Sequence, residues 1–113
     1  MNRKVLTDGS GLWFNSNTAV RFEENTRWNG SNHISVATGS QWEHEFLYYT
    51  RSGRWVLHHL SQWQGSLDRW EQISEAQAVR WLSVNECHSD DGIDALPESV
   101  RDAVDAGLAA LEL

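Results

Sequence analysis

Two histidines, His44 and His59, come closest in type and spacing to a catalytic or ligand-binding pair. They lie in two apolar-rich segments, 42–50 and 55–63, which a turn separates. A two-residue Ser52-Gly53 turn makes the histidines diagonal neighbours on one face, about 7–8 Å apart at the backbone. That distance suits an acid and a base acting on one substrate. No third ligand accompanies them, so ordinary half-buried histidines are the simpler reading, and we predict no metal and no cofactor.

Seven tryptophans in 113 residues are the second chemical feature, because indole offers a large stacking surface. The two-residue turn segregates large apolar residues better than a three-residue loop, which would place Glu45 opposite His59. If both faces of the sheet are covered, both carry apolar residues, and segregation no longer favours one register over the other. The preferred register gathers four indoles on one face: Trp42, Trp55, Trp63 and Trp70. They either stack on a base, sugar or peptide or fill the core beneath the helices.

The net charge of −7 belongs to the C-terminal part of the chain. Residues 1–69 hold seven basic and six acidic residues, whereas residues 70–113 hold two basic and ten acidic ones. An acidic segment does not bind a phosphate backbone, so nucleic acid is an unfavourable partner for it. It suits a basic protein surface, or it is a solvated face that keeps the protein in solution. The candidate contact residues are Asp90, Asp91, Asp94, Asp102 and Asp105.

Cys87 and His88 lie beside aspartates but lack the paired spacing that makes a zinc site recognisable. The aspartates also lack the ligand spacing of a calcium loop. Nucleotide-binding and hydrolase motifs are absent from the sequence. We therefore predict an acidic loop over residues 86–95, without a metal.

The elements that must position these residues change in character near residue 74. Residues 1–73 alternate short apolar runs with turn residues, which predicts an antiparallel meander of five to seven short strands. Within it, Asn29-Gly30 favours a hairpin with a two-residue type I′ turn. Ser74 and Gln77 form a capping-box pattern that predicts a helix over 74–85. Apolar residues at helical spacing predict an amphipathic helix over 96–112.

These patterns predict one α+β domain spanning 1–113, with the two helices packed on one sheet face. The chain shows no export leader or long apolar run and has a single cysteine, so we expect a cytoplasmic protein that does not bind membranes. The leading hypothesis is a non-enzymatic protein-binding module, such as a regulator or inhibitor. The alternatives are a small enzyme or ligand-binding pocket with His44 and His59, and, third, single-stranded nucleic-acid binding on the sheet. A homodimer through an exposed edge or face of the sheet is a further expectation.

Overall fold

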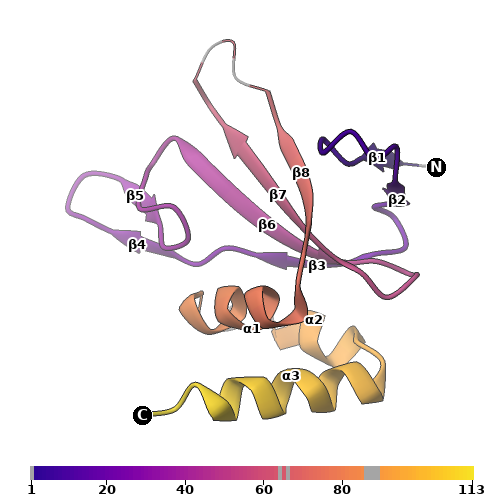
Figure 1. Ribbon diagram of the computed structural model, residues 1–113. Coiled ribbons are helices and arrows are strands. Elements are labelled where there is room, and N and C mark those ends of the chain that lie inside the picture. Colours follow the sequence, from indigo (N-terminus) through magenta and orange to yellow (C-terminus); the bar gives the residue numbers. More distant parts are fainter. Residues whose placement is uncertain (1, 64, 66, 86–89) are drawn as a thin grey trace.

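The computed structural model describes residues 2–63, 65, 67–85 and 90–113, which form strands followed by helices (Figure 1). The strands are β1 (Arg3–Val5), β2 (Trp13–Asn15), β3 (Val20–Glu23), β4 (Thr26–Trp28), β5 (His33–Ser35), β6 (Glu43–Tyr49), β7 (Trp55–Ser61) and β8 (Arg69–Ile73). The helices are α1 (Glu75–Val84), α2 (Asp90–Ala95) and α3 (Glu98–Ala110). Strand pairs in these ranges are antiparallel, so the predicted α+β class is confirmed.

The central sheet has four strands in the order β3-β6-β7-β8. Separate hairpins are formed by β1 with β2 and by β4 with β5. The described ranges hold eight strands, one more than the upper prediction, because the segment 19–28 splits into β3 and β4. At the split, the Glu24 carboxylate accepts a hydrogen bond of 2.6 Å from the Glu45 backbone N–H. The Asn25 N–H donates to Asn85 Oδ1 at 2.9 Å, so the chain leaves the sheet here.

The β6–β7 hairpin closes with a three-residue loop, 51–53, and the predicted two-residue turn is wrong. Gly53 has a φ of +90°, and its N–H bonds the Thr50 carbonyl at 3.0 Å. A left-handed glycine at the end of a three-residue loop is a favoured bulged hairpin geometry. The resulting register places Glu45 opposite His59. Apolar segregation could not identify this register, because both faces of the sheet are covered.

One side of the central sheet, here called the helix face, carries Phe22, Leu47 and Trp55. These three side chains share a buried cluster with residues from the C-terminal part: Ala78, Val79, Trp81, Leu82, Leu96 and Val104. Figure 1 shows the helices together on one side of the sheet. The packing is close, since a Cβ built on Gly92 of α2 would lie 2.8 Å from the Phe22 ring.

The opposite side, here called the hairpin face, carries Tyr48, Val56 and Trp70. These residues cluster with Leu6 and Phe14 of residues 3–15, here called the N-terminal hairpin segment. The Phe14 ring lies 5.3 Å from that of Tyr48 and 5.8 Å from that of Trp70, measured between centroids. The sheet therefore separates two apolar cores.

Thr7 holds the N-terminal segment to β8. Its backbone N–H and its hydroxyl both donate to the Trp70 carbonyl, at 2.8 and 3.1 Å. The hydroxyl oxygen in turn accepts from the Trp70 N–H at 3.0 Å. These bonds join residues 63 positions apart in the sequence. We refer to them as the Thr7–Trp70 latch.

The helix predictions are confirmed at α1 and corrected before α3. Ser74 and Gln77 form the expected capping box, with the Gln77 N–H 3.1 Å from Ser74 Oγ. The predicted acidic loop 86–95 is wrong over 90–95, where Gly92 and Ile93 of α2 pack towards the core. Residues 86–89, with Cys87 and His88, lie outside the described part. No helix of the described chain is long and apolar enough to cross a membrane.

The hairpin predicted at Asn29-Gly30 is present, but its loop is longer than predicted. Trp28 pairs with His33, which leaves four residues, 29–32, in the loop. Asn29 Oδ1 accepts from the backbone N–H groups of Ser31 and Asn32 at 2.9 and 2.8 Å. This side-chain bonding stabilises the four-residue loop in place of the type I′ turn.

Candidate functional site

His44 and His59 do not form the predicted pair. In the observed register His59 lies opposite Glu45, whereas His44 lies opposite Leu60. Successive residues of a strand point to opposite faces, so the two imidazoles are on different sides of the sheet. His59 and Glu45 share the helix face, where Glu45 Oε1 also accepts from Trp81 Nε1 at 3.1 Å. The predicted diagonal arrangement of the two histidines on one face is therefore wrong.

Each histidine instead meets its own carboxylates. His44 Nδ1 lies 2.9 Å from Glu24 Oε2. His59 Nδ1 lies 3.5 Å from Glu45 Oε2, and its Nε2 lies 3.7 Å from Glu43 Oε1. Among the residues that the structure describes, no group of three or more His, Cys, Asp or Glu side chains is arranged to hold a metal ion.

A third histidine, His58, is buried beside an aromatic ring, and its surroundings shift its pKa. Its ring stacks on Trp70 with centroids 3.5 Å apart and an interplanar angle of 8°. His58 Nε2 lies 2.9 Å from Asp68 Oδ2, and its buried Nδ1 has no hydrogen-bond partner among the residues that the structure describes. Burial lowers the pKa of His58 below its usual range, and the hydrogen bond to Asp68 opposes that shift. The sequence patterns did not single out His58, because the wrong register hid its contact with Trp70.

The four predicted platform indoles do not share one face either. Trp55 is buried in the helix-face core and Trp70 in the hairpin-face core. Trp42 and Trp63 are 44% and 61% exposed, with ring centroids 5.7 Å apart. An indole pair thus remains at the surface where β6 begins and β7 ends, and the four indoles do not form one continuous face.

The acidic residues of α3 form a stripe on its outer side, here called the acidic stripe. Glu98, Asp102 and Asp105 are exposed and recur at intervals of four and three residues. At about 100° per residue this spacing places them on one side of the helix, away from buried Val104. Asp94 of α2 is also exposed, whereas the side chains of Asp90 and Asp91 lie outside the described part.

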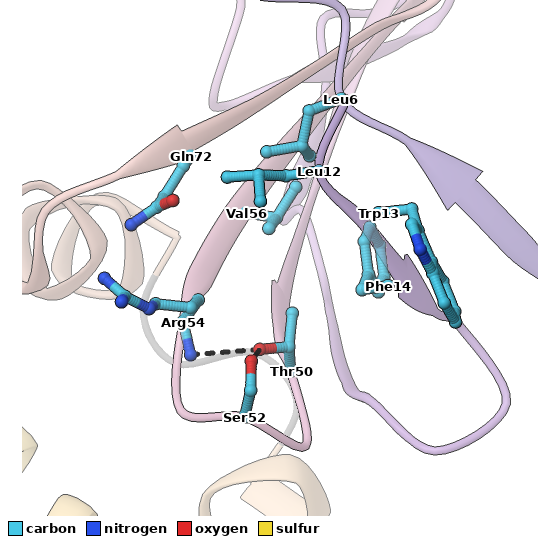
Figure 2. A pocket seen from close by; sticks show the side chains of 9 residues that line it. All are labelled: Leu6, Leu12, Trp13, Phe14, Thr50, Ser52, Arg54, Val56 and Gln72. Carbon is cyan, nitrogen blue, oxygen red and sulfur yellow. Dashed lines mark hydrogen bonds between the residues drawn. The ribbon is translucent and has the colours of Figure 1, made fainter. Parts of the chain in front are cut away.

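A pocket of about 450 Å³ lies between the N-terminal hairpin segment and the hairpin face (Figure 2). Its described lining residues are Leu6, Leu12, Trp13, Phe14, Thr50, Ser52, Arg54, Val56 and Gln72. Sites of roughly 300–1,000 Å³ with apolar walls and a few polar groups commonly bind small molecules. No local sequence signal marks this pocket, since its walls come from three separate parts of the chain: 6–14, 50–56 and residue 72.

Comparison with known proteins identifies no relative. No protein-family model, curated protein or solved structure matches the chain. Any assignment of function therefore rests on the geometry of these surfaces.

Proposed function

We propose that the protein is a non-enzymatic protein-binding module whose acidic C-terminal half engages a basic surface on its partner. The observation that carries the proposal is the acidic stripe of Glu98, Asp102 and Asp105. Among the described residues these carboxylates form no ion pair within 4.0 Å, although Arg101 belongs to the same helix. Unpaired carboxylates on one side of a helix present a negative surface that steers a cationic partner.

Two of the three carboxylates of the acidic stripe do not stabilise α3. Carboxylates favour the first turn of a helix, where the macrodipole is positive; Glu98 lies in that turn, but Asp102 and Asp105 lie beyond it. Like charges three or four residues apart destabilise a helix by a few tenths of a kcal/mol. The helix is held by Val104, which is fully buried on its inner side. The arrangement of these charges therefore supports a role outside the fold.

The aromatic surface supports the same class of function. Trp42 and Trp63 form an exposed indole pair, and tryptophan is enriched among the residues that dominate protein–protein binding energies. In the observed register His44 and His59 lie on opposite sides of the sheet, so a shared pair of imidazoles does not support the alternative of a small enzyme or ligand-binding pocket.

The test is affinity capture of partners from cell extract, followed by titration of each purified partner at rising salt. We expect the triple variant Glu98→Gln, Asp102→Asn, Asp105→Asn to lose most of the affinity and most of the salt dependence. The control neutralises Asp8, Glu23 and Glu71, which lie in the strand region, residues 1–73, and changes the net charge equally. Equal retention of the partner by both variants and the wild type would refute the proposal.

A further inference from the structure

The pocket of Figure 2 has one apolar side and one polar side. Trp13 and Phe14 lie on one side of it and Arg54 on the other, with Leu12 and Val56 between them in this view. Leu12 closes the apolar part and is 55% exposed. This apolar wall offers a contact surface to an apolar group of a ligand.

Arg54 is the one charged side chain among the described residues that line the pocket. No described carboxylate lies within 4.0 Å of its guanidinium. Arg51, in the same turn, lines an adjoining cavity of about 320 Å³ that shares Trp13, Phe14 and the turn residues with this pocket. Two guanidinium groups thus flank one turn in a protein whose net charge is −7. Such a local excess of positive charge complements an anion.

The hydroxyl groups of the same turn offer a further donor. Thr50 Oγ1 accepts from the Arg54 backbone N–H at 3.0 Å and lies 3.2 Å from Ser52 Oγ. The bond between the two hydroxyls uses one of their two hydrogens, so the other is available to a ligand. The Gln72 side chain also lines this polar side.

From this arrangement we propose that the pocket binds a small aromatic carboxylate. Its ring occupies the apolar side against Leu12, Trp13 and Phe14, and its carboxylate accepts hydrogen bonds from the Arg54 guanidinium. A planar guanidinium matches a carboxylate with two parallel bonds, which favours this head group over a neutral amide. The binding is distinct from that of the acidic stripe, which attracts the opposite charge.

The probes are 1-naphthaleneacetate and its neutral analogue 1-naphthaleneacetamide, titrated by calorimetry and by backbone amide chemical shifts. We expect the carboxylate to bind about tenfold more tightly than the amide, since a hydrogen bond to a charged group contributes about that factor. Shifts should concentrate at Leu12, Phe14 and Gln72. Carboxylate binding no tighter than amide binding, or an absence of shifts at these residues, would overturn the proposal.

Two variants separate the polar contact from the apolar one. Arg54→Gln should reduce carboxylate affinity about tenfold and leave amide affinity unchanged. Leu12→Ala should weaken both probes by a similar factor, because it removes apolar wall and no charge. Both residues are exposed, so the fold should persist, and circular dichroism checks this. Arg27→Gln, in the distant β4, is the matched charge control. If Arg27→Gln reduces the affinity for the carboxylate as much as Arg54→Gln does, the proposal would also be overturned.

Discussion

The two faces of the central sheet are covered in different ways. Helices cover the helix face, and Phe22 and Leu47 there are 1% and 0% exposed. A short two-stranded hairpin covers the hairpin face, where Phe14 lies beside a pocket of about 450 Å³. A helix presents a continuous apolar side over its whole length, whereas a three-residue strand offers few side chains. A cavity of about 480 Å³ also lies on the helix side, beside Trp55, Ile73 and Val100, so the two faces differ in the elements that cover them and in the more apolar lining of the hairpin-face pocket.

The largest expected effect contrasts a phenylalanine on each side of the sheet. Phe22→Ala should lower the free energy of unfolding by about 3–5 kcal/mol, because it empties a fully enclosed site. Phe14→Ala should cost about half as much, because the neighbouring pocket is already open and the hairpin can detach locally. Urea denaturation measures both values. Equal costs would show that the two cores are equally enclosed.

A second contrast lies within the helix face. Gly92→Ala should destabilise the protein by about 1–3 kcal/mol, because its Cβ would lie 2.8 Å from the Phe22 ring. Gly107→Ala meets Val79 methyl groups at 3.0 and 3.1 Å, but alanine improves helix propensity by about 1 kcal/mol. We expect these effects to offset each other at Gly107. Thermal unfolding of the two variants should therefore differ, and a larger loss for Gly107→Ala contradicts the proposed packing.

The Thr7–Trp70 latch predicts a smaller effect that is confined to the hairpin face. Thr7→Val keeps the side-chain shape but removes the hydroxyl, and should cost about 0.5–1.5 kcal/mol. Hydrogen exchange should accelerate in β1 and β2 more than in β6 and β7. Thr18→Val is the control, since its hydroxyl donates one exposed bond to the Asn15 carbonyl. Equal acceleration of hydrogen exchange in the β1–β2 hairpin and in the central sheet would mean that the latch supports the whole fold.

The smallest expected effect is a pH dependence on the hairpin face. Burial lowers the pKa of His58 in the folded state, with smaller contributions from Lys4 and Arg21, while Asp68 acts in the opposite direction. The unfolded chain therefore takes up a proton more readily. The free energy of unfolding should decrease as the pH falls from about 6.5 through the lower pKa of the folded state.

The variant His58→Gln should lose this part of the pH dependence in urea titrations between about pH 7.5 and 5. His33→Gln, on the exposed surface of β5, is the matched control and should retain the wild-type slope. Identical slopes for the wild type and His58→Gln would exclude the buried imidazole as the cause.

Short sequence patterns correctly predicted the helices whose ends and faces depend on residues that are neighbours in the chain. The Ser74–Gln77 capping box identified the start of α1, and helical spacing identified α3. The register of β6 with β7 was not predicted correctly. It depends on the left-handed conformation of Gly53 in the loop, whereas the prediction relied on how apolar residues divide between the two faces. The helix α2 was missed because its packing against Phe22 is a tertiary contact.

The candidate sites were less predictable than the fold. The charge asymmetry in the sequence indicated an acidic surface, and three carboxylates of α3 do lie along its outer side. The predicted positions of the two histidines and of the four indoles both depended on the register of β6 with β7, so the error in this register made both predictions wrong. The pocket required the position of the N-terminal segment relative to Val56 and Gln72, which no short sequence pattern contains.

The Thr7–Trp70 latch also has a consequence for the order of folding. The strands β6, β7 and β8 and the helix α1 are consecutive in the chain, so their contacts close short loops. The latch closes a separation of 63 residues, which costs more chain entropy, and we expect it to form late. During synthesis, Leu12, Trp13 and Phe14 therefore leave the ribosome long before the strand that completes their pocket. A nascent chain paused before residue 70 should expose these side chains to chaperones.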